Sequence, residues 1–203
     1  MRPLLHVPAL AACLFLCVGA QAAGNAEKGE LRAQTCMGCH GAPGERNAYP
    51  GYRIPKLGGQ HDFYIVNALK EYKEKKRWHP TMRAQASTLT EQDRENVAAY
   101  FSSMANPNGA SNNVGDNTPF KQCAACHGPD GNSPSNPDKT QGAPILAGQY
   151  PDYIVQVLHD YKSGKRKNPI MNAMASGLSD DQMETIAAFL YRQNGLVAPE
   201  IAH

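Results

Sequence analysis

The chain carries the pentapeptide Cys36-Met37-Gly38-Cys39-His40 and repeats its pattern as Cys123-Ala124-Ala125-Cys126-His127. In a Cys-x-x-Cys-His motif the spacing lets two thiols bond to the two vinyl groups of one haem, while the adjacent imidazole reaches the iron. The two motifs therefore predict two covalently bound haem c groups. Cys36 and Cys39 would attach the first, with His40 on its iron, and Cys123 and Cys126 would attach the second, with His127 on its iron.

Two other uses of a Cys-x-x-Cys pair fit less well. Zinc sites commonly combine two such pairs about 15 to 20 residues apart. Here 84 positions separate Cys39 from Cys123, and each motif would supply only three ligands. A thioredoxin-type pair would need a strand followed by a helix, and the sequence shows no such context.

Residues 1–23 read as a secretory signal peptide. Arg2 provides a positive charge, Val7 to Val18 form an apolar stretch, and Ala20-Gln21-Ala22 offers a small-x-small cleavage site. Cleavage near Ala22/Ala23 would place the mature protein in the periplasm. It would also remove Cys13 and Cys17, so the four cysteines that remain are all used by the haem motifs and none is left for a disulfide.

The stretch Leu10-Ala11-Ala12-Cys13 also resembles a lipoprotein cleavage box, which would leave a lipid on Cys13. Against this, the apolar run continues through Leu16, where a polar tether is expected. No later segment has the ~20 apolar residues of a transmembrane helix, although peripheral association with a membrane stays open. The formal net charge of +2 predicts no strong attraction to nucleic acid.

An internal repeat surrounds the two motifs. After each motif the chain reads Pro-x-Leu-x-Gly-Gln and then a helical pattern, and the paired positions differ by 89: Pro55 and Pro144, Gln60 and Gln149, Tyr64 and Tyr153, Leu69 and Leu158, Tyr72 and Tyr161. The sequence thus predicts two copies of one domain. We expect the first at 24–105, a linker at 106–113, and the second at 114–203. Domains of this size have small hydrophobic cores, so a bound haem would add stability to each copy.

The apolar periodicity predicts an all-α fold. Asn25 is a plausible cap for a helix running into Cys36, and Tyr64 to Tyr72 has a helical stripe. A later helix should start at Thr90, with Asp93 completing the cap and Val97, Tyr100, Phe101 and Met104 buried. Ser179 and Gln182 open its counterpart, with Met183, Ile186, Phe189 and Leu190 inward. Pro119 allows only a short helix before Cys123, starting near Thr118.

The repeat also tests candidates for the sixth iron ligand, because a true ligand should recur in both copies. Met82 and Met171 recur at the 89-residue offset, in segments read as Pro-x-Met loops. His79 aligns with Asn168, and Met174 aligns with Gln85, so neither recurs. Met82 and Met171 are therefore the predicted ligands, with His79 the alternative in the first domain and Met174 in the second.

Two further expectations concern the surroundings of the haems. The other ring N–H of each proximal histidine needs an acceptor, and the carbonyl of Pro55 or Pro144 could provide it, although a paired proline also suits a simple turn. Basic residues gather at Lys70 to Arg77 and Lys162 to Lys167. They could neutralise helix C-termini or form a positive rim that steers an acidic partner.

Together, the tandem motifs, the Pro-x-Leu-x-Gly-Gln segments and the Pro-x-Met segments resemble the cytochrome c4 family of di-haem periplasmic class I cytochromes c. The resemblance covers essentially the whole mature chain. It implies two tandem class I cytochrome c domains related by pseudo-twofold symmetry, with haem propionates near their interface. It also implies His/Met ligation by His40 and Met82 and by His127 and Met171. The implied role is to carry electrons from a quinol-oxidising complex towards a terminal oxidase.

Two other functions stay open at this point. A di-haem oxidoreductase of peroxidase type would need one open haem, whereas both copies keep the Pro-x-Met segment. A subunit docked on a larger oxidase would carry the same motifs. The expectation is an electron-transfer protein and not an enzyme, because two His/Met-ligated irons offer no open position for a substrate.

Overall fold

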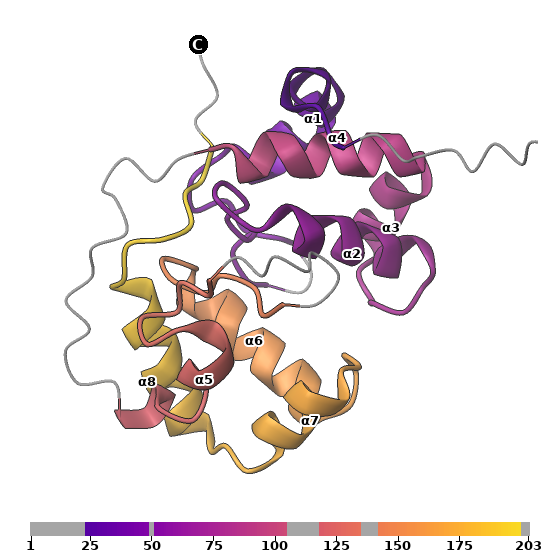
Figure 1. Ribbon diagram of the computed structural model, residues 1–203. Coiled ribbons are helices and arrows are strands. Elements are labelled where there is room, and N and C mark those ends of the chain that lie inside the picture. The colour runs from indigo at the N-terminus through magenta and orange to yellow at the C-terminus, as the bar shows by residue number, and fades with distance from the viewer. Residues whose placement is uncertain (1–22, 49–50, 105–117, 135–141, 200–203) are drawn as a thin grey trace, which may run out of the picture.

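The computed structural model describes residues 23–48, 51–104, 118–134 and 142–199, and within them the fold is helical (Figure 1). The predicted signal peptide, Cys13 and the 106–113 linker lie outside these residues. The only β-type pairings in the described ranges are two isolated bridges, Arg46 with Arg53 and Gly58 with Val197. None of the described helices is both long and apolar enough to cross a membrane. The all-α prediction is confirmed.

The first domain contains α1 (Ala26–His40), α2 (Asp62–Lys73), α3 (Pro80–Ser87) and α4 (Glu91–Ser102). Asn25 caps α1 by accepting the Lys28 N–H, as predicted. Helices α1 and α4 pack closely, because Gly29 has no Cβ to collide with the Asn96 carbonyl. The core combines residues of all four helices, with Ala33, Leu69, Ala86 and Phe101 among them.

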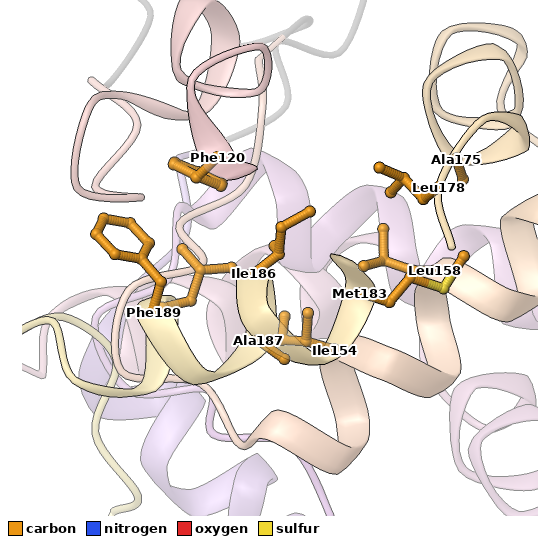
Figure 2. Packing of buried hydrophobic residues seen from close by; sticks show 10 residues of the cluster. Phe120, Ile154, Leu158, Ala175, Leu178, Met183, Ile186, Ala187 and Phe189 are labelled. Carbon is orange, nitrogen blue, oxygen red and sulfur yellow. The ribbon is translucent and has the colours of Figure 1, made fainter. Parts of the chain in front are cut away.

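The second domain contains the 3-10 turn η1 (Thr118–Phe120), α5 (Ala124–His127), α6 (Pro151–Lys162), α7 (Pro169–Ser176) and α8 (Asp180–Tyr191). The expected shortening before Cys123 is confirmed. Phe120 is 1% exposed, and its ring centre lies 5.4 Å from that of Phe189 (Figure 2). This packing fixes the segment before Cys123, where the first domain instead has the long helix α1. Ile154, Leu158, Met183 and Leu190 belong to the same core.

Both predicted capping boxes are present. The Thr90 and Ser179 hydroxyls accept the N–H of Asp93 and Gln182, and these side chains bond back to the cap backbone. All four apolar residues predicted for the buried face of α8 are buried, as are Val97 and Phe101 of α4. Two details were wrong: Tyr100 is only half-buried, and Met104 lies beyond the end of α4 at Ser102.

The prediction of Pro-x-Met loops was also wrong. Met82 and Met171 each occupy the third position of a short helix, α3 or α7. A proline stands at the first position of both helices, where its missing N–H costs nothing and its fixed φ suits a helix. His79 and Asn168 precede these prolines and cap the helices, accepting the N–H of Met82 and Met171.

The two domains are held together by contacts on several segments. Asp152 forms ion pairs with Arg46 at 3.0 Å and Arg53 at 3.3 Å. The Tyr150 hydroxyl accepts the Gly44 N–H at 2.8 Å. The segment after α8 crosses to the first domain, where Val197 and Gly58 exchange two backbone hydrogen bonds of 3.0 Å. The predicted linker is therefore not the sole connection between the halves.

Candidate haem sites

The cysteine pairs have the same arrangement in both domains. Cys36 and Cys123 are half-buried and pack against their domain cores, whereas Cys39 and Cys126 are exposed. Burial raises the pKa of the Cys36 and Cys123 thiols above its usual value. All four thiols are free, so none is consumed by a disulfide. Each domain thus offers two free thiols, one half-buried and one exposed.

The two histidines are prepared to bind a metal through Nε2. His40 and His127 are 8% and 6% exposed, and their Nδ1 atoms lie 2.9 Å and 3.0 Å from the carbonyl oxygens of Pro55 and Pro144. Because a carbonyl can only accept, Nδ1 must carry the proton and Nε2 keeps its lone pair. Burial lowers the pKa of both imidazoles, which favours this neutral form. The predicted proline carbonyl contacts are confirmed.

The predicted residues of the first site meet around one cavity. Its walls include Cys36, Cys39, His40 and Met82, with Ile65 and Leu69 of α2 supplying apolar surface. The cavity continues against the second domain, where Pro144, Ile145 and Tyr153 line it. A flat apolar ligand that reached both Cys36 and Met82 would therefore extend towards the domain interface.

In the second domain, Cys123 and Met171 pack against the same core cluster, beside Leu146 and Tyr153. Met174 is not part of that packing group. In the first domain, His79 lines the cavity, but its Nδ1 accepts the Met82 N–H at 3.3 Å. The neutral ring then carries its proton on Nε2, which leaves no lone pair there for a metal. The geometry thus favours Met82 over His79.

Arg77 fits an anionic group in this cavity. It lines the cavity and is 8% exposed, and its Nη2 donates to the Tyr64 hydroxyl at 3.1 Å. Its Nε has no hydrogen-bond partner, since Glu71 is 3.6 Å away. A buried, unsatisfied guanidinium N–H is costly unless a ligand completes it. A haem propionate is such a ligand, and the residues present fit a haem.

Sequence reasoning missed the cluster that surrounds Arg77. Arg166, its counterpart at the 89-residue offset, donates to the same Tyr64 hydroxyl at 3.0 Å. The Arg77 guanidinium also lies 5.2 Å from the Tyr72 ring centre, and that of Arg166 lies 4.8 Å from Tyr161. Applying the 89-residue offset to the arginines, as well as to the methionines, would have revealed Arg77 and Arg166 as a repeated pair. Among the described residues, no group of three His, Cys, Asp or Glu suits a zinc ion.

The chain is similar to known proteins over most of its length. The family model for cytochrome c matches residues 26–105 and 117–193. Cytochrome c4 of Pseudomonas aeruginosa is 32% identical over 84% of this chain and 90% of its own length. A thiosulfate dehydrogenase electron acceptor of Stutzerimonas stutzeri is 29% identical over 77% and 78% of the two chains. The crystal structure of reduced recombinant cytochrome c4 from Pseudomonas stutzeri has a TM-score of 0.65 and 29% identity, covering 86% of this chain and all of the other.

Proposed function

Because the chain belongs to the cytochrome c family, and within it to the cytochrome c4 group, we propose that it carries electrons in the periplasm from a quinol-oxidising complex to a terminal oxidase. It holds two covalently bound haem c groups, which supply one-electron ferric/ferrous couples when bound. The observation that carries the proposal is the repeated site: each domain pairs a histidine of fixed tautomer with a methionine of a capped helix.

The proposed roles follow the repeat. Cys36 and Cys39 would attach the first haem, and His40 and Met82 would be the ligands of its iron. Cys123, Cys126, His127 and Met171 would do the same for the second. If these residues ligate both irons, neither iron would offer a place for a substrate, and this supports a carrier role over catalysis. His/Met ligation also favours a raised reduction potential.

The electron donor is the least constrained part of this proposal. A relative carries the name thiosulfate dehydrogenase electron acceptor, which makes a sulfur-oxidising enzyme a second candidate donor. The two donors can be compared directly by following haem reduction with a quinol-oxidising membrane fraction and with a thiosulfate dehydrogenase plus thiosulfate. Reduction by the thiosulfate system alone would overturn the quinol assignment and leave the carrier role intact.

The carrier role has a spectroscopic test. Methionine bound to ferric haem gives a weak near-infrared absorption band, and the oxidised protein should show it with intensity for two haems. Incubation with hydrogen peroxide should produce no turnover. A high-spin ferric signal, or measurable peroxide reduction, would favour the di-haem oxidoreductase alternative instead.

A further inference from the structure

Gln60 and Gln149, the last residues of the two Pro-x-Leu-x-Gly-Gln segments, each reach across the domain interface. Both are 4% exposed. The Gln149 amide accepts the Lys56 N–H at 3.0 Å and donates to the Lys56 carbonyl at 3.1 Å. The Gln60 amide accepts the Ile145 N–H at 3.0 Å and donates to the Ile145 carbonyl at 2.9 Å. Lys56 and Ile145 are themselves related by the 89-residue offset, so the exchange is reciprocal.

The peptide groups that these glutamines hold are the ones that orient the proximal histidines. The N–H of Lys56 and the carbonyl of Pro55 belong to one peptide group, and that carbonyl accepts the His40 Nδ1–H. The peptide of Pro144 and Ile145 likewise joins His127 to Gln60. In each case a continuous chain of hydrogen bonds runs from the histidine, through one peptide, to the glutamine of the other domain.

Each glutamine is fully committed to this arrangement. The Oε1 atoms also accept the N–H of the next residue, His61 or Tyr150, at 3.0 Å. Both lone pairs of Oε1 and at least one amide N–H are therefore used, and only one orientation of the amide satisfies these partners. Such buried chains polarise their members, so a bond at one end strengthens the bond at the other.

We propose that Gln60 and Gln149 are crossed positioning residues: each sets the hydrogen bond on the proximal histidine, and thereby the reduction potential, of the haem in the other domain. The inference rests on the proposed ligation by His40 and His127. Hydrogen bonds to the far nitrogen of a metal-bound imidazole raise its basicity. A stronger acceptor at Pro55 makes His40 a stronger electron donor to the iron, which favours the ferric state.

The direction of the effect separates this role from simple loosening of the interface. Removing the Gln149 amide weakens the polarisation of the Pro55 carbonyl, so the potential of the first haem should rise. Opening the interface would instead admit water around the haems, which stabilises the more highly charged ferric state and lowers the potential. A loosened interface is therefore not expected to raise the reduction potential of the haem in the opposite domain.

The experiment compares holoprotein variants by spectroelectrochemistry, with each haem assigned by NMR through contacts of its ring methyls with residues of its own domain. In Gln149→Leu the reduction equilibrium constant of the first haem should increase about threefold or more, and about tenfold corresponds to 59 mV for one electron. In Gln60→Leu the second haem should respond. Gln149→Asn, whose shorter amide cannot hold both Lys56 groups, should shift the first haem in the same direction.

Tyr150→Phe is the matched control, because it removes an uncharged bond from the same interface, the one to Gly44, without touching either peptide. It should leave the difference between the two potentials unchanged. The proposal is overturned if the glutamine variants shift the haem of their own domain, lower the potential, or change nothing. Low-spin spectra of the unaltered protein test the ligation separately, so the crossed effect can fail while the carrier role stands.

Discussion

Met82 and Met171 occupy the same position of equivalent helices, but the residues that cap these two helices differ. His79 caps α3 as Asn168 caps α7, so a histidine and an asparagine perform one task at matching places. The repeat favoured Met82 over His79 because His79 does not recur. The hydrogen bond from the Met82 N–H to the His79 Nδ1 points the same way.

We predict that Met82→Ala and Met171→Ala each remove half of the near-infrared band of the oxidised protein. The methionine sulfur is the source of that band, and each domain should contribute equally. Absorption spectra normalised to the haem content provide the measurement. Met174→Ala is the matched control, one turn along α7, and should leave the band intact. A band lost in Met174→Ala but kept in Met171→Ala would reverse the ligand assignment in the second domain.

At the scale of the elements, sequence patterns predicted the longer helices, which have a clear apolar periodicity. They failed at α3 and α7, whose eight residues bury little besides Ala86 and Ala175. Two turns are too short for an apolar stripe to stand out. The informative signal there was local: a proline preceded by a capping side chain.

The capping boxes of α4 and α8 should differ in their response to acid. Hydrogen bonds from the Thr90 backbone and side chain, with a further contribution from Arg32, lower the Asp93 pKa below its usual 3.8. Gln182 does not titrate. Because the lowered pKa belongs to the folded state, the stabilisation is present above pH 3.8 and disappears as the pH falls through the lowered value. The box on α4 is thus the acid-sensitive one.

Asp93→Gln, which copies the α8 box, should destabilise the protein by about 0.5 kcal/mol at pH 7. The difference should disappear as the pH falls through the lowered Asp93 pKa and the carboxyl becomes protonated in the wild type. Thermal midpoints of the two proteins over a pH series from 7 downwards provide the measurement. Gln182→Asp is the reciprocal variant and should make α8 acid-sensitive. A wild-type advantage that persists unchanged at low pH would contradict the assignment.

For the whole molecule, the sequence predicted two domains but not how they dock. Gln60 and Gln149 were visible as a repeated pair. An internal repeat does not show, however, that each of the two glutamines binds the backbone of the other domain. Docking depends on side chains that meet backbone groups of distant residues, and such contacts leave no periodic trace. The same holds for Arg77 and Arg166, which converge on Tyr64 only once the domains are assembled.

Docking also brings the two basic runs together. Lys165 of the second domain lies 4.6 Å from the ring centre of Trp78 in the first, and Trp78 is 49% exposed. Lys73 and Lys162 instead donate to the carbonyls of Leu89 and Leu178 inside their own domains. The runs are therefore mixed: some lysines complete the fold, while Lys165 belongs to a surface shared by both domains beside the methionine helices. An exposed aromatic ring beside cations suits an acidic protein partner.

We predict that Lys165→Gln slows association with an acidic redox partner on the order of threefold at low salt. The rate should also depend less steeply on ionic strength, because a surface cation acts mainly by steering the encounter. Stopped-flow reduction by the partner over a series of salt concentrations measures both quantities. Lys28→Gln is the control of equal charge change, since Lys28 is exposed on α1, which packs on α4. Equal slowing in both variants would show that net charge, and not the surface around Trp78, guides the partner.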